Sequence, residues 1–299
     1  MRNAKYLLLP IILVCCLTAG EAKETVSVEA SLSSERIYEG EPVALSVSIT
    51  TTNPDIAYIE LMSREDFQGF TILNVPTADA GDGHLTRIQK NGEKAYTAVI
   101  YRIMLMPNAP GTLTIPSLEF NIGLSRPTVI DHPFFGHIRS TTVEDAVLRT
   151  KPVKAKCNRL PRPADGYSGA IGNFTIEGSV PPGKIYADSP ALVIFRISGT
   201  GYIDSSSFPD IRKHLPKGMV LRTEEESSDF ICVGEELQST IELECTLVAE
   251  EPGEYVVPPI PFTFFDPVAE SYRTVSSKQL TINAEGIDIP SKPKVLHSI

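Results

Sequence analysis

An internal repeat constrains the fold of this chain more than any other feature of its sequence. Residues 28–49, VEASLSSERIYEGEPVALSVSI, align without a gap with residues 176–197, IEGSVPPGKIYADSPALVIFRI. Residues 106–122, MPNAPGTLTIPSLEFNI, match residues 249–265, AEEPGEYVVPPIPFTFF, in the same way. Each pair matches a turn and the strand-like segments beside it. The repeat therefore predicts that the chain folds into two copies of one structural unit.

Apolar and polar residues alternate within both copies. Val43, Leu45, Val47 and Ile49 recur at every second position, the period of a strand with one buried face. Similar alternation occurs in residues 152–157, 240–249 and 278–284, and no segment shows a helical stripe. The 24 prolines suit short strands and turns. We predict an all-β fold with two tandem immunoglobulin-like β-sandwich domains.

The N-terminal residues have the three parts of a signal peptide. Arg2 and Lys5 precede an apolar run at 7–17, and small residues at Gly20 and Ala22 suit cleavage after Ala22. This run is too short for a bilayer-spanning helix, which needs about 20 residues, and no later run is long enough. Lipidation at Cys15 or Cys16 is the alternative. We predict export and no transmembrane span in the mature chain.

The repeat and the composition together set the expected boundaries. They predict a signal peptide at 1–22, a first β-sandwich domain at 23–158, a Gly/Pro-rich junction at 159–172, a second β-sandwich domain at 173–285 and a C-terminal tail at 286–299. The net charge of −10 and the pI near 5.1 argue against nucleic acid as a partner.

A glycine-rich stretch, DGYSGAIGNFTIEGS at 165–179, raises the question of phosphate binding. Gly166, Gly169 and Gly172 are three residues apart, which is neither a dinucleotide fingerprint nor a P-loop. No helix is predicted after them to bind a phosphate. We predict no cofactor and interpret the stretch as an inter-domain connection that needs positive φ or close packing.

Candidate chemical sites are sparse elsewhere. His132, His137 and Asp131 lie in residues 123–146, which we expect to form a long loop, and the histidine spacing does not suit a metal. Phe134 and Phe135 would either hold this loop down or dock a partner. Asp79 and Asp82 lack the further ligands that calcium needs.

Catalytic arrangements are not apparent either. Ser168 does not lie in a G-x-S-x-G motif. We interpret two groups of glutamates as solvated charges in loops: Glu224–Glu226, and Glu250 with Glu251. Cys157, Cys232 and Cys245 remain after cleavage, and we expect buried free thiols, with a Cys232–Cys245 bridge as the alternative. We therefore predict no catalytic residue and no metal ligand.

The junction resembles that of the BatD-type aerotolerance (oxygen tolerance) family. LPRPADGYSGAIGNFTIEGSV followed by ISGTGYID carries the resemblance, which covers most of residues 25–285. The matching signature residues are Tyr167, Ser168, Gly169, Ala170, Gly172, Asn173, Phe174, Gly199 and Gly201. Tyr202 stands where the family has asparagine. Many members end in a transmembrane helix that this chain lacks, so it resembles a short form.

The resemblance implies a non-enzymatic, exported binding or scaffold protein of the periplasm or cell envelope, linked to oxygen and stress tolerance. It implies partners with von Willebrand factor A domains and, indirectly, a MoxR-type ATPase. Phe134, Phe135 and Tyr202 are our candidate partner contacts. The alternatives are a secreted carbohydrate-binding or adhesion module, which the lack of tryptophan disfavours, and a hydrolase with a site assembled across loops.

Overall fold

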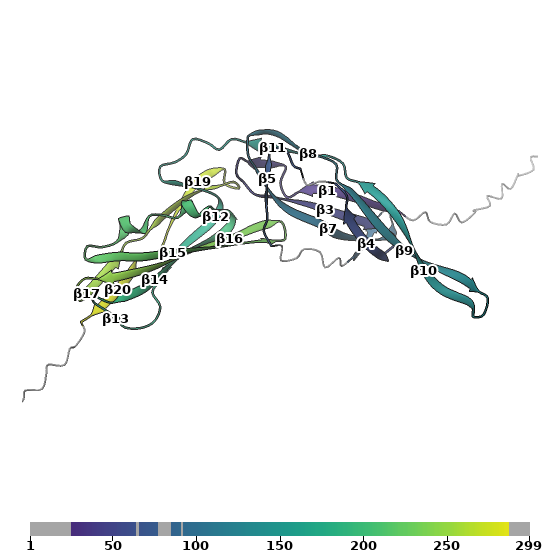
Figure 1. The fold of residues 1–299 in the computed structure, drawn as a ribbon. Helices are drawn as coiled ribbons and strands as arrows, with labels where there is room; N and C mark the ends of the chain where they lie inside the picture. Colours follow the sequence, from purple (N-terminus) through teal and green to yellow (C-terminus); the bar gives the residue numbers. More distant parts are fainter. Residues whose placement is uncertain (1–24, 64–65, 77–84, 91, 287–299) are drawn as a thin grey trace, which may run out of the picture.

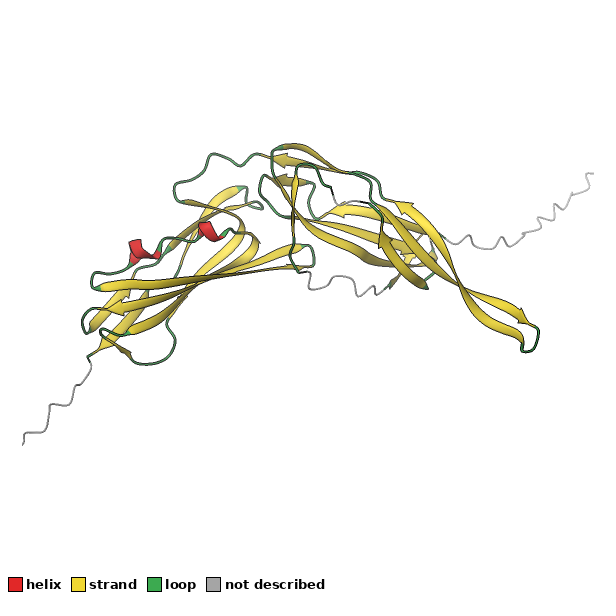
Figure 2. Cartoon of the chain, in the orientation of Figure 1, coloured by secondary structure: helices red, strands yellow, loops and turns green. Residues whose placement is uncertain are grey.

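The computed structural model describes residues 25–63, 66–76, 85–90 and 92–286, which form two β-sandwich units (Figures 1 and 2). The all-β prediction is confirmed, because the only helices among these residues are two short 3₁₀ turns. The predicted signal peptide, the Asp79–Asp82 motif and nearly all of the predicted tail lie outside the described residues. The immunoglobulin-like topology and the outer boundaries of the two domains remain predictions.

The first unit holds strands β1 to β11 in three sheets. One sheet has the order β1-β3-β7-β5, with β6 also paired to β7; the others are β10-β9-β4 and β2-β11-β8. The strands are β1 (Val26–Leu32), β2 (Arg36–Tyr38), β3 (Val43–Thr51), β4 (Ile56–Leu61), β5 (Phe70–Leu73), β6 (Thr86–Lys90), β7 (Glu93–Pro107), β8 (Gly111–Ile115), β9 (Glu119–His132), β10 (Gly136–Arg149) and β11 (Val153–Asn158).

The second unit holds the remaining strands in two sheets, β15-β16-β14-β12-β18-β19 and β13-β20-β17. The elements are β12 (Tyr167–Ser179), β13 (Ile185–Tyr186), β14 (Pro190–Tyr202), η1 (Ser205–Ser207), η2 (Ile211–His214), β15 (Met219–Val233), β16 (Glu236–Ala249), β17 (Gly253–Val257), β18 (Pro261–Asp266), β19 (Ser271–Ser276) and β20 (Leu280–Glu285).

The predicted repeat appears in the pairing of the strands. In the first unit β2 pairs in parallel with β11, and β11 pairs antiparallel with β8. The second unit repeats this arrangement with β13, β20 and β17. Likewise β3 lies between β1 and β7, as β14 lies between β12 and β16. The aligned sequences therefore occupy equivalent places in two similar sandwiches.

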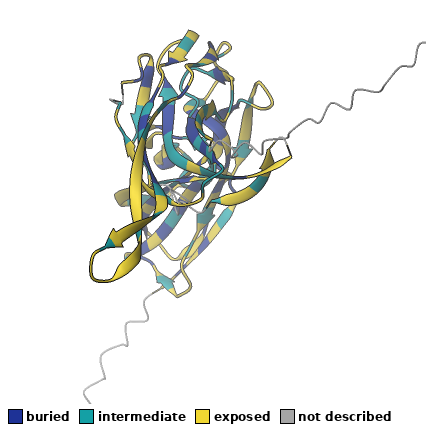
Figure 3. Ribbon diagram, turned by 90° about the vertical axis from the view of Figure 1, so that its right-hand side faces the viewer, coloured by how far each residue is buried: buried dark blue, intermediate teal, exposed yellow. Residues whose placement is uncertain are grey.

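Each unit has its own hydrophobic core. The first is built around Leu45 and Phe120 and the second around Phe174, Phe195 and Phe262, all of them at most 1% exposed. Figure 3 shows the buried residues in dark blue in the interior and the exposed residues in yellow around them. Burying a large apolar side chain contributes about 1.5–3 kcal/mol, so the aromatic cores stabilise both sandwiches.

Two local expectations were wrong. Residues 123–146 form no long loop but belong to the antiparallel hairpin of β9 and β10. Residues 167–172 form no connection but begin β12, so the signature lies within the second sandwich. The connection between the units is formed instead by residues 159–166, which follow β11.

Candidate binding surfaces

The signature glycines allow two strands of the second unit to approach closely. Gly172 of β12 pairs with Gly201 of β14, and Phe174 pairs with Gly199. A Cβ atom at Gly172 would lie 2.0 Å from the carbonyl oxygen of Thr200, and Gly172 also has a φ of 149°. A Cβ atom at Gly199 would lie 2.0 Å from the carbonyl oxygen of Asn173. The predicted need for positive φ and close packing is therefore confirmed.

Other signature residues fix β12 in the second sandwich through side-chain packing and a hydrogen bond. Phe174 is 1% exposed and packs edge-to-face on Phe262 and Phe264, with ring centroids 6.1 and 5.5 Å away. Tyr167 packs in the same way on Tyr272, 4.9 Å away. The backbone N–H of Ala170 donates to Oγ of Ser168. These contacts assign the signature a structural role in the second sandwich.

The start of β12 also faces the first unit. Cδ1 of Ile171 lies 3.0 Å from the position that a Cβ atom of Gly40 would take. The rings of Tyr38 and Phe265 meet edge-to-face at 4.8 Å, and the N–H of Cys232 donates to the carbonyl of Pro76 at 2.8 Å. The two units are thus joined by packing as well as by residues 159–166.

A small apolar cluster completes this junction. It consists of the buried residues Ala44, Met104, Cys232 and Leu237, with Tyr202 packed against it. The cluster explains why Ala44 of β3 is buried, although alternation predicts that it lies on an exposed face. Tyr202, predicted to contact a partner, is partly buried and stacked on Phe230.

Beside the cluster lies a cleft of about 790 Å³ that both units line. Arg36 and Glu41 reach it from the first unit, and Asn173, Glu236 and Arg273 from the second. Burial raises the pKa of Glu41, opposed by a hydrogen bond from the N–H of Tyr38. The lining mixes charges of both signs.

The edge strand β15 presents a second surface. Among the described residues β16 is its only strand partner, the N–H of Cys232 near its end donates to the carbonyl of Pro76, and residues 222–229 are exposed throughout. Glu225 and Asp229 lie on one face, whereas Glu224 and Glu226 lie on the face that carries the core. The prediction of loop charges was therefore wrong for Glu224–Glu226, which belong to a strand. Inward-pointing charges protect such an edge against pairing with an identical edge.

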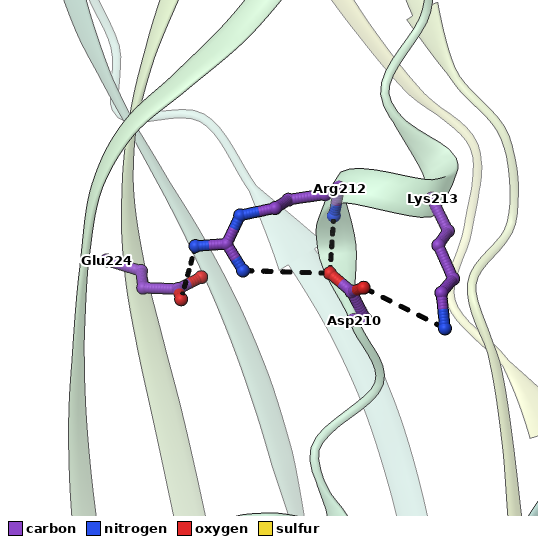
Figure 4. Close-up of polar contacts among 4 residues, drawn as sticks. All are labelled: Asp210, Arg212, Lys213 and Glu224. Atoms are coloured by element: carbon purple, nitrogen blue, oxygen red, sulfur yellow. Dashed lines mark hydrogen bonds and ion pairs between the residues drawn. The ribbon is translucent and has the colours of Figure 1, made fainter.

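An ion-pair network ties η2 to this strand (Figure 4). Nη2 of Arg212 donates to Oε1 of Glu224 at 2.6 Å, and the N–H of Arg212 donates to Oδ1 of Asp210 at 3.1 Å. The ammonium of Lys213 lies 3.8 Å from Asp210. Ile211 between them is buried in the core. The network therefore orders η2 beside one end of the acidic edge.

The β9–β10 hairpin forms the third surface and extends from the first unit (Figures 1 and 2). Phe134 and Phe135 at its turn are 89% and 77% exposed, so they do not hold a loop down. Nδ1 of His137 is hydrogen-bonded to Oδ1 of Asp131. No group of three or more potential metal ligands occurs in the described part of the chain.

The three cysteines that the structure describes, Cys157, Cys232 and Cys245, are buried and form no disulfide bond. Cys232 pairs with Leu237 across the β15–β16 turn, far along the ladder from Cys245, as the free-thiol interpretation predicts. Burial, with smaller effects of Glu39 and Glu41, raises the pKa of Cys157 to about 11. Burial, together with Glu224, raises that of Cys245 to about 11. Protonated thiols of this kind are poor nucleophiles at neutral pH.

Taken together, the chain is an all-β protein with two similar sandwiches whose accessible features are a cleft, a strand edge and a hairpin. A family model described as a BatD DUF11 like domain matches residues 30–156 and 178–284, one match in each unit. The chain therefore belongs to the BatD family. None of the curated proteins compared with the chain matches it. Within the described residues, no helix is long and apolar enough to cross a bilayer.

Proposed function

We propose that this protein is a non-enzymatic binding or scaffold protein, exported to the bacterial cell envelope. The free edge of β15 is the observation that carries this proposal, because an unpaired strand edge binds extended segments of other proteins through main-chain hydrogen bonds. Membership of the BatD family supports the envelope location. Its partners are membrane proteins with von Willebrand factor A domains and, through them, a MoxR-type ATPase.

The charge of the edge selects the partner segment. Glu224, Glu225, Glu226 and Asp229 place negative charge on both faces of β15. Opposite charges across a strand pair stabilise it, and like charges destabilise it. A basic extended segment of a partner therefore pairs with β15, whereas a second copy of β15 is repelled.

The packed junction suits a scaffold role. The ring contact of Tyr38 with Phe265 and the cluster around Cys232 hold the two sandwiches together, so surfaces on different units keep a defined spacing. Of our candidate partner contacts, Phe134 and Phe135 are accessible to a partner, whereas Tyr202 contributes to the junction. A role in tolerance of oxygen or envelope stress would follow from the partners that this scaffold assembles.

The packing of Tyr167 and Tyr202 weighs against a sugar-binding role for these two residues. Sugar-binding platforms need an exposed aromatic face. Two tyrosines that could supply one, Tyr167 and Tyr202, instead pack against Tyr272 and Phe230.

Affinity capture from a solubilised envelope fraction tests the proposal. The bait is the full mature chain, compared with the variant Glu225→Lys/Asp229→Lys and with the control Glu29→Lys/Glu254→Lys. The control makes the same charge change at exposed positions on β1 and β17. We expect proteins with von Willebrand factor A domains with the wild type and the control, and a strong loss with the β15 variant. Their absence from the wild-type sample would contradict the function, and equal recovery in all three would contradict the assignment to β15.

A further inference from the structure

The β9–β10 hairpin is longer than the sandwich requires. Its counterpart in the second unit, β18–β19, has 6 residues in each strand, whereas β9 and β10 have 14 each. In β9 the last buried residue is Leu124, and residues 125–132 are all partly or fully exposed. At about 3.3 Å per residue, these eight residues reach roughly 26 Å beyond Leu124. Residues 125–143 are here called the arm.

The end of the arm carries apolar side chains on all sides. Phe134 and Phe135 occupy the turn and are 89% and 77% exposed. Ile130 and Ile138 are directly paired across the strands and so lie on one face, while Val129 lies on the other because neighbouring residues alternate. Val129 and Ile130 are 62% and 51% exposed. The arm thus presents an apolar tip, and none of the described sheets or helices other than its own two strands packs on it.

A bilayer fits this tip better than a protein does. The two phenylalanines offer about 300–500 Å² of buried area, and a stable protein interface needs about 800 Å² from each partner. A flat protein surface would also reach only one face of a two-stranded arm. The boundary between lipid headgroups and acyl chains surrounds an inserted tip and needs no complementary pocket.

The charges of the arm match an anionic surface. Asp131 is the only carboxylate between residues 127 and 143, and it is hydrogen-bonded to Nδ1 of His137. Arg139 is exposed opposite Val129, three residues from Gly136 at the turn. Three residues correspond to about 10 Å, the depth over which amphipathic segments enter the headgroup region. Arg139 therefore lies level with lipid phosphates when the phenylalanines are inserted, although the chain as a whole has a charge of −10.

The backbone of the turn is prepared for a less polar environment. The N–H of Phe134 donates to Nδ1 of His132 at 3.3 Å, and Pro133 has no N–H to satisfy. The ring of His132 also packs against Phe135, with ring centroids 4.9 Å apart. Few unpaired backbone donors would have to leave water when the tip enters lipid.

We propose that the tip of the arm, residues 129–138, is a lipid-binding site that inserts Phe134 and Phe135 into the headgroup region of an anionic phospholipid bilayer. Arg139 contacts the lipid phosphates. This site goes beyond the protein-binding function proposed for β15, and it stands or falls independently of it.

Vesicle co-sedimentation of the full mature chain tests the site. The probes are vesicles of phosphatidylglycerol with phosphatidylcholine, and of phosphatidylcholine alone. We expect Phe134→Ser/Phe135→Ser to reduce partitioning onto the anionic vesicles about tenfold or more, and Arg139→Gln to reduce it severalfold. Val268→Ser removes an apolar side chain that is 94% exposed in the second unit and should bind like the wild type. Equal binding of the wild type and the double serine variant would overturn the proposal.

A single tryptophan reports the depth of insertion, because the chain contains none. Phe134→Trp should show a blue-shifted emission with anionic vesicles and quenching by brominated lipids, whereas Val268→Trp should show neither. An emission of Phe134→Trp that is unchanged by vesicles would overturn the proposal. If that emission shifted with a captured partner protein instead, the tip would be a protein-docking site.

Discussion

Replacing Gly199 with alanine tests the close approach of β12 and β14 by adding one methyl group. The new Cβ atom would lie 2.0 Å from the carbonyl oxygen of Asn173 and 2.8 Å from Cα of Phe174, whereas real Cβ contacts stay beyond 3.0 Å. The strands must therefore separate by about 1 Å. Gly199 has no positive φ, so the effect is steric and not a matter of backbone conformation.

The expected magnitude follows from what this separation breaks. Losing two ladder hydrogen bonds beside the Phe174–Gly199 pair costs about 1–3 kcal/mol in total. Shifting Phe174 within a close-packed core costs about 1–3 kcal/mol more. The lower entropy of the unfolded alanine chain returns about 0.4–1 kcal/mol. We expect a net loss of about 1–5 kcal/mol, centred near 3 kcal/mol, from the free energy of unfolding of the second unit.

Urea unfolding followed by circular dichroism measures this loss. The matched control is Gly253→Ala, where the nearest atom to the new Cβ is 4.0 Å away and φ is again not positive. It should be neutral or slightly stabilising. A loss below about 1 kcal/mol for Gly199→Ala, or equal effects of the two substitutions, would refute the packing argument.

Three further predictions concern the second unit and the thiols. Phe174→Ala should lower the free energy of unfolding by about 3–5 kcal/mol, measured by urea titration, and Phe174→Leu should lower it by clearly less. Burial acts to raise the pKa of Asp266, but hydrogen bonds from Ala269, Arg273 and Val268 outweigh it and lower the pKa. The ionised carboxylate therefore stabilises the fold at pH values above its ordinary pKa, and this stabilisation is lost as the pH falls through the lowered pKa. Acid unfolding curves should show the wild type more stable than Asp266→Asn above that range, with the difference disappearing below it. The pKa values of Cys157 and Cys245 are raised to about 11, above the ordinary 9.0, so the stability that these thiols contribute is complete below pH 9 and is lost as the pH approaches 11. A variant with alanine at both positions should show a smaller loss between pH 9 and 11, and an equal loss would contradict the assignment.

The repeat and the glycines could be predicted from sequence because their physical requirements are local. Ile37-Tyr38 and Ile185-Tyr186 lie in equivalent short strands, because each of these strands pairs in parallel with the last strand of its unit. Glycines three residues apart indicate positive φ or close packing, which Gly172 shows, although the stretch that we expect to be a connection begins a strand.

The arm and the acidic edge were missed because neither depends on a core. The arm is polar on much of both faces, so apolar alternation does not reveal it. The β-branched residues on each side of the phenylalanines, from Thr128 to Ile130 and from Thr141 to Val143, are the signal that could have revealed it. Three consecutive glutamates have low strand propensity, and Glu224–Glu226 form a strand because β16 pairs with them.

Site-specific crosslinking in cells tests the central claim, that the edge of β15 binds envelope proteins. A photoreactive side chain at Ser227, exposed in the middle of β15, is compared with one at Thr281, exposed on β20. The account predicts that Ser227 crosslinks to proteins with von Willebrand factor A domains and that Thr281 does not. Crosslinks from Ser227 only to envelope polysaccharide, or the same proteins from both positions, would contradict it.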